Sequence, residues 1–192
     1  MPLFAIQFFS WSGMFALWIY AVPVVTRFMF QTNASDSAAY RNGLFYVSIG
    51  FAFYSLLGTS LSFLLPRLIE RFGNGALHGS ALLIGAIGIS SFSIITEPTW
   101  LFPAFAAIGI AWGSIGNIPY LVIGNAAPPQ RMAHFMRLFA FSTAIPQAIA
   151  TFALAFAVDH WFAEATNRVM ALGGGSMAFA AFLAFIFKKR LN

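Results

Sequence analysis

The chain contains no cysteine and very few charged residues. Only 8% of its 192 residues are Asp, Glu, Lys or Arg, whereas soluble domains contain about 25%. The lack of cysteine excludes disulfides, a thiol nucleophile and metal sites built on thiolates. Because 60% of the residues are hydrophobic and 18% are aromatic, the charged side chains are too few to cover a soluble protein. We therefore expect most of the surface to face lipid.

The sequence also has few residues suited to catalysis. Its acidic residues and histidines all fall in predicted loops or at the ends of predicted spans: Asp36, Glu70, Glu97, Asp159, Glu164, His78, His134 and His160. Buried carboxylates are the usual proton relays in membranes, and none is predicted here. No H-E-x-x-H, G-x-S-x-G or phosphate-loop motif occurs. We predict that the protein is not an enzyme and has no cofactor or metal site.

Six apolar runs are present, each near the roughly 20 residues that a helix needs to cross a bilayer. They cover about 3–28, 43–65, 78–96, 99–123, 135–158 and 169–187. Their length and continuity favour helices, because barrel strands are about 10 residues long and alternate in polarity. Pro23, Pro119 and Pro146 lie in or near these runs and favour kinks. We predict an all-α membrane protein with a single six-helix transmembrane domain, 1–192.

The basic residues predict the orientation of these spans. One side would hold Arg67, Arg71, Arg131, Arg137, Lys188, Lys189 and Arg190, and the other would hold Arg27, Arg41 and Arg168. The positive-inside rule then places both termini in the cytoplasm, for a multi-pass protein of the inner or plasma membrane. The net charge of +5 lies in short loops and at the C-terminus, so we expect no nucleic-acid partner. The first run is too long, and lacks preceding basic residues, for a secretory signal.

Polar residues recur on one face of four predicted spans, at helical spacing. These residues are Gln7, Trp11 and Trp18; Ser48, Ser55, Thr59 and Ser62; Gly109, Gly113, Gly116, Asn117 and Tyr120; and Thr143, Gln147 and Thr151. Small residues such as Ser and Gly often only let helices pack closely. The amides of Gln7, Asn117 and Gln147 are more costly inside a membrane, which favours contact with a ligand or pathway. Trp11 has the alternative role of an interface anchor.

Three stretches resemble sugar transporters of the major facilitator superfamily. "FFSWSGMFALWIYAVP", preceded by Gln7, resembles their seventh helix, most closely in the sucrose and proton-associated sugar transporter branch near the glycoside–pentoside–hexuronide group. "GIAWGSIGNIPYLVIGNAAPPQRMAHFMRLFAFSTAIPQAIA" resembles the tenth helix, the "PPERMG" loop and the eleventh helix of that branch. "PRLIERFGNG" resembles the charged loop after the eighth helix. Gln130 and Ala133 replace the usual Glu and Gly of the "PPERMG" loop.

The resemblance covers essentially the whole chain, but only the C-terminal half of a twelve-span family. It implies half of a secondary active transporter that performs H⁺-coupled symport of a disaccharide or glycoside by alternating access. Amide and hydroxyl groups would pair with sugar hydroxyls, and aromatic faces would cover the ring. The residues expected to line the sugar site are Gln7, Trp11, Asn117, Tyr120 and Gln147. The residues expected at a cytoplasmic gate are Arg67, Glu70, Arg71 and Arg131, with topology and lipid head-group contact as their alternative role.

Because the resemblance covers only the C-terminal half of the family's length, several partner arrangements are possible. The family's coupling carboxylates lie largely in the half that is absent here. The chain could be a fragment, could pair with a separately encoded N-terminal six-helix half, or could form a two-fold homodimer that mimics the full transporter. The other expected partners are membrane lipid and a small-molecule sugar. The rival interpretations are a non-transporting remnant, scaffold or regulatory half-protein, and an intramembrane enzyme, which would need a buried catalytic pair.

Overall fold

The computed structural model describes residues 2–162 and 165–191, and this part of the chain is all-helical, as predicted. The long helices are α1 (Pro2–Pro23), which continues as the π-helical segment η1 (Val24–Met29), α2 (Ala38–Phe72), α3 (Asn74–Ser91), α4 (Leu101–Ile115), α6 (Met132–His160) and α7 (Asn167–Ile186). The shorter elements are η2 (Pro98–Trp100), α5 (Ile118–Ala126), η3 (Pro129–Arg131) and α8 (Lys188–Leu191).

Within residues 2–162 and 165–191, five helical segments are long and apolar enough to cross a membrane, which indicates a multi-pass membrane protein. They are Pro2–Met29, Ala38–Phe72, Pro98–Ala126, Pro129–His160 and Asn167–Ile186. The predicted span 78–96 is not among them. It corresponds to α3, which begins earlier, includes the polar residues Asn74 and His78 in its first turns, and ends at Ser91. Six comparable spans were predicted, and five meet this criterion.

Helix α2 is longer than the sequence predicts at both ends. Its start is fixed by Ser37, whose Oγ accepts a hydrogen bond from the backbone N–H of Tyr40 at 3.1 Å. Its end is fixed by Gly73, with a φ of 77° that favours glycine. Most of the stretch predicted as a charged loop, "PRLIERFGNG", is therefore helix, with Pro66 inside it.

The predicted span 99–123 is two helices rather than one. α4 ends at Ile115 and α5 begins at Ile118, so that Gly116 and Asn117 form a break within an apolar stretch. Pro119 explains this break, because it has no N–H to donate to the carbonyl of Ile115 one turn earlier.

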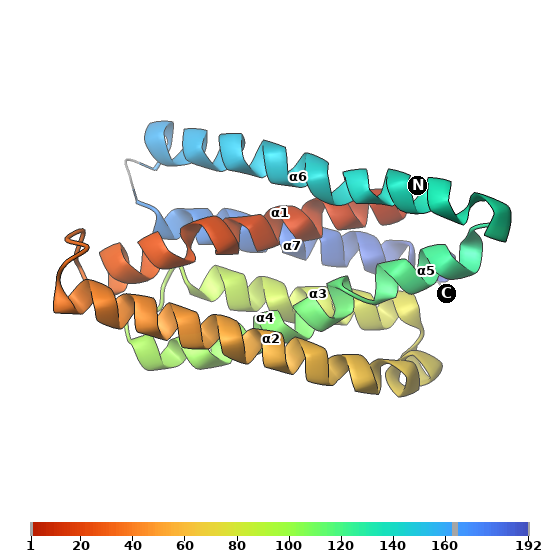
Figure 1. Cartoon of the computed structure of the whole chain (residues 1–192), viewed down its shortest axis with the longest axis horizontal. Coiled ribbons are helices and arrows are strands. Elements are labelled where there is room, and N and C mark those ends of the chain that lie inside the picture. Colours follow the sequence, from red (N-terminus) through yellow and green to blue (C-terminus); the bar gives the residue numbers. More distant parts are fainter. Residues whose placement is uncertain (1, 163–164, 192) are drawn as a thin grey trace.

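The helices pack as a bundle along one long axis (Figure 1). α7 packs against α1 and α3, α3 also packs against α4, and α4 packs against α2. Glycines allow the close approaches: a Cβ added to Gly13 would lie 2.7 Å from the carbonyl oxygen of Gly173, and one added to Gly113 would lie 2.7 Å from that of Gly58. α6 packs mainly against α1, and its Phe152 is 78% exposed. In a membrane such a surface faces lipid or a partner.

Candidate functional site

Four aromatic side chains from three helices meet near the middle of the bundle. Trp18 of α1 donates its Nε1–H to the hydroxyl oxygen of Tyr54 on α2, at 3.2 Å. Trp112 of α4 lies edge-to-face with both α1 tryptophans, with ring centroids 5.8 Å from Trp11 and 5.6 Å from Trp18. Trp11 and Trp18 therefore share a face, as their spacing predicts. Their partner Trp112 was not singled out from the sequence.

Asn117 joins the break between α4 and α5 to α2. Its Nδ2 donates to the carbonyl oxygen of Gly113 at 2.7 Å and to Ser62 Oγ at 2.9 Å. Ser62 in turn donates to the carbonyl oxygen of Gly58 at 3.0 Å. The polar faces predicted separately for the second and fourth spans thus meet at this point. The amide offsets part of the cost of breaking a helix inside a membrane.

Gln7 is fully buried, and neither its Oε1 nor its Nε2 has a hydrogen-bond partner among the described residues. The buried Nε1 of Trp11, one turn later on α1, also has none. Unpaired polar atoms are costly in a low-dielectric interior, so these groups indicate a missing partner: water, a ligand or another arrangement of the helices.

Tyr120 and Gln147 lie instead on surfaces that this chain does not cover. Tyr120 is 44% exposed, with its ring edge-to-face with Phe139 at a centroid distance of 4.9 Å. Gln147 is exposed on α6, where its backbone carbonyl accepts a hydrogen bond from Thr151 Oγ1 at 2.8 Å. The five residues predicted to line a sugar site are therefore not gathered into one enclosed cavity. Gln7 is closed in, Asn117 is half-buried, and Gln147 faces outward.

The four predicted gate residues, Arg67, Glu70, Arg71 and Arg131, are all exposed. None of them forms an ion pair within residues 2–162 and 165–191. The Arg71 guanidinium lies 5.2 Å from the centroid of the Phe72 ring, a cation–π contact.

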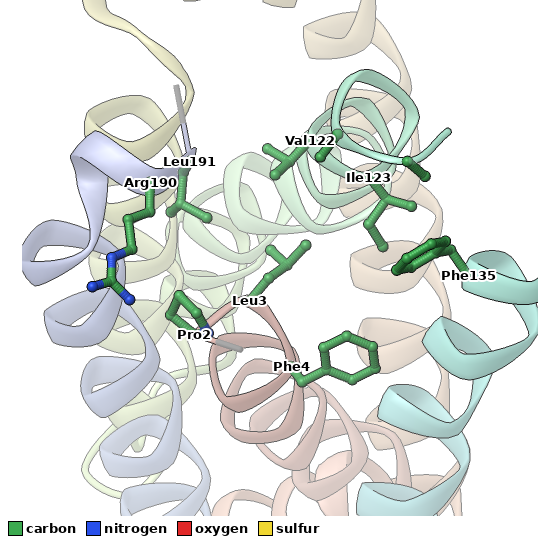
Figure 2. A pocket seen from close by; sticks show the side chains of 10 residues that line it. Pro2, Leu3, Phe4, Val122, Ile123, Phe135, Arg190 and Leu191 are labelled. Carbon is green, nitrogen blue, oxygen red and sulfur yellow. The ribbon is translucent and has the colours of Figure 1, made fainter. Parts of the chain in front are cut away.

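A pocket of about 350 Å³ opens where α1 and α6 begin and where α5 and α8 end. Figure 2 shows Leu3, Phe4, Ile123 and Phe135 around it, whereas the guanidinium of Arg190 turns away. None of the predicted sugar-binding residues lines this pocket. Its apolar wall suits hydrocarbon rather than a sugar, which needs convergent hydrogen-bonding groups.

His78 corrects the sequence-based placement of the histidines at the ends of spans. The helix begins at Asn74, so His78 lies more than one turn inside it and is fully buried. Its Nδ1 lies 2.7 Å from Ser114 Oγ of α4, and its Nε2 has no partner among the described residues. Gly73, which ends α2, is the sequence feature that indicates an earlier start for α3.

Comparison with known proteins gave no match: no family model, no curated protein and no solved structure is significantly similar to the chain. Residues 2–162 and 165–191 contain no group of three or more His, Cys, Asp or Glu side chains that could hold a metal ion. The chemistry within reach is hydrogen bonding by amide, hydroxyl, indole and imidazole groups, together with stacking on aromatic rings.

Proposed function

We propose that this protein is the C-terminal six-helix half of a major facilitator superfamily sugar transporter. It would lie in the inner or plasma membrane with both termini in the cytoplasm and carry a disaccharide or glycoside together with H⁺. α3 would be the sixth membrane helix, shielded by α4 and α7. The bundle would rock against a second six-helix unit, which is an N-terminal half of the same polypeptide, a separately encoded N-terminal half, or a second copy.

Polar groups that the chain leaves exposed on three helices carry this proposal. Its exposed members are Ser48, Ser55 and Thr59 on α2, Tyr120 on α5, and Gln147 and Thr151 on α6. In Figure 1, α2, α5 and α6 lie on the near side of the bundle, with α3 and α7 farther from the viewer. Amide and hydroxyl groups are costly against lipid, so a partner or a wet cavity is expected to cover these groups.

A sugar between two such halves would meet groups of the right chemistry. Gln147, Tyr120 and Asn117 supply amide and phenol groups for sugar hydroxyls, and Trp11 supplies an aromatic face. Gln7, buried one turn before Trp11, would take part only when α1 moves relative to its neighbours. The exposed gate residues, such as Arg67 and Glu70, would pair with charges of the second half or with lipid head groups.

Transport can be tested in proteoliposomes. The chain, alone and with an N-terminal half encoded beside it, is reconstituted, and uptake of radiolabelled sucrose is measured under an inward proton gradient. We expect uptake in one of the two preparations. Asn117→Ala and Gln147→Ala should each lower this uptake by at least about tenfold, because each removes a hydrogen bond to the substrate of roughly 1.4 kcal/mol or more. Ser80→Ala, an exposed hydroxyl on α3, is the matched control and should transport normally.

The alternative is a non-transporting remnant, scaffold or regulatory half-protein. The outward position of Gln147 and the apolar pocket of Figure 2 favour it, because the described part of the chain does not gather the predicted sugar contacts into one pocket. Absence of gradient-driven uptake in both preparations would support this alternative and reject the transporter.

A further inference from the structure

Three fully buried polar side chains come from three different helices: Gln7 from α1, His78 from α3 and Ser114 from α4. His78 and Ser114 are already in contact. The depth of Gln7 relative to that of His78 follows from the way in which α1 and α3 pack against α7.

Both α1 and α3 run antiparallel to α7. The contacting pairs are Gly13 with Gly173, Phe9 with Ser176, Gly85 with Met177 and Gly79 with Phe185. In each helix, earlier residues meet later residues of α7. α1 and α3 are therefore parallel to each other, and they also touch directly.

A common reference point sets the level of the two side chains. Gly13 of α1 and Gly85 of α3 both lie against Met177. Gln7 precedes Gly13 by about 9 Å along its helix, and His78 precedes Gly85 by about 10 Å, at 1.5 Å of rise per residue. The amide and the imidazole thus lie at nearly the same depth.

Their unpaired atoms are complementary. A neutral imidazole has one N–H donor and one acceptor nitrogen, and becomes a donor at both nitrogens when protonated. His78 Nδ1 has Ser114 Oγ as its partner, whereas Nε2 has none. Gln7 Oε1 is an acceptor without a donor at the same depth.

We infer that His78 is a proton-binding site whose charged form is bound by Gln7 and Ser114. A proton from water forms the Nε2–H bond using the nitrogen lone pair, and no bond in the protein is broken. Nε2–H then donates to Gln7 Oε1, and Nδ1–H donates to Ser114 Oγ. That this proton is the coupling ion rests on the proposed function; the proton site itself does not.

Few other ionisable groups surround His78. Burial disfavours an uncompensated charge, so protonation and the approach of the Gln7 carbonyl must occur together. α4 has no ionisable side chain, and α7 has only Arg168 in its first turn, at the far end from His78. The others on packed elements are Tyr20 of α1; Tyr40, Arg41, Tyr46, Tyr54, Arg67, Glu70 and Arg71 of α2; Tyr120 of α5; and Lys188, Lys189 and Arg190 of α8. The charged members of this set are exposed.

Protonation would have a mechanical result. It would tie α1 to α3 through Gln7, one turn from Trp11 and the aromatic contact with Trp112. A proton would thus change the packing of the helix that carries a predicted sugar contact.

The test uses the whole chain in lipid nanodiscs. The double variant His134→Gln/His160→Gln leaves His78 as the only histidine, and both replaced residues are exposed. We expect its ¹⁵N imidazole signals to titrate once between about pH 3 and 8, with tryptophan emission changing at the same midpoint. Gln7→Leu in this background should lower the midpoint by at least about one pH unit, because a hydrogen bond to a charged group is lost.

Two results would overturn the inference: imidazole signals that do not change over this range, or a midpoint unaffected by Gln7→Leu in a variant that keeps its helical circular dichroism. Both readouts are independent of transport. Titration without sugar uptake would reject the proposed function and support the proton site. Uptake without titration would reject the proton site and support the proposed function.

Discussion

Replacing Asn117 by alanine tests the connection between the helix break and α2. The change removes two hydrogen bonds, one to Gly113 within the broken helix and one to Ser62 on α2. Interhelical hydrogen bonds in membranes contribute about 0.6 kcal/mol on average and at most about 1.7, and the bond to a freed carbonyl contributes about 1 kcal/mol. We expect Asn117→Ala to lower the free energy of unfolding by about 1–3 kcal/mol.

A double-mutant cycle isolates the bond between the two helices. Ser62→Ala and the double variant Asn117→Ala/Ser62→Ala are unfolded reversibly with SDS in mixed micelles, and helicity is followed by circular dichroism. The coupling energy should be about 0.6–1.7 kcal/mol. Ser60→Ala, an exposed serine two residues away on α2, is the matched control and should be near neutral.

A coupling energy below about 0.3 kcal/mol would refute this reasoning, because independent sites add to within that limit. It would mean that Asn117 and Ser62 do not pair in the folded protein, even if each substitution alone is destabilising. The polar faces of α2 and the α4–α5 break would then have to be held together by glycine packing alone.

Two further substitutions test the packing of α1 and the break. Gly13→Ala should destabilise by about 1–3 kcal/mol in the same unfolding assay, because its Cβ would lie 2.7 Å from the Gly173 carbonyl oxygen; Gly175→Ala, with open space around it, should be neutral or stabilising, and equal effects at the two sites would contradict the close α1–α7 approach. Pro119→Ala restores a backbone N–H, so the amide at position 119 should become protected from hydrogen exchange by bonding to Ile115; rapid exchange there would show that the break has another cause.

The sequence predicts those elements that depend on residues close together in the chain. The apolar runs give five membrane-long helical segments in the part of the chain that the structure describes, because lipid requires some 20 apolar residues in a row. Helical spacing placed Trp11 and Trp18 on one face, where both meet Trp112. The break after Ile115 was hidden by continuous hydrophobicity, although Pro119 was recognised as a source of a kink.

Contacts between distant parts of the chain were beyond such patterns. The sequence places His78 at the end of a span. Its burial follows from packing against α4, where its partner Ser114 lies 36 residues away along the chain. The sequence grouped Gln7 with Gln147 as amides facing a ligand. The structure encloses the first between helices and leaves the second on the outer surface of α6. Which side of a helix a neighbour covers is decided by the whole bundle, and spacing alone does not encode it.

The packing of α1 against α7 and α6 has a consequence for biosynthesis. α1 leaves the ribosome before its two main partners among the described helices, α6 and α7, and α7 begins about 140 residues after α1 ends. At roughly 5–20 residues per second, α1 waits on the order of 10–30 s for α7. During that interval its buried Gln7 and tryptophan nitrogens face lipid or the insertion machinery. A chaperone or the translocon itself is therefore expected to hold α1 until α7 has been synthesised.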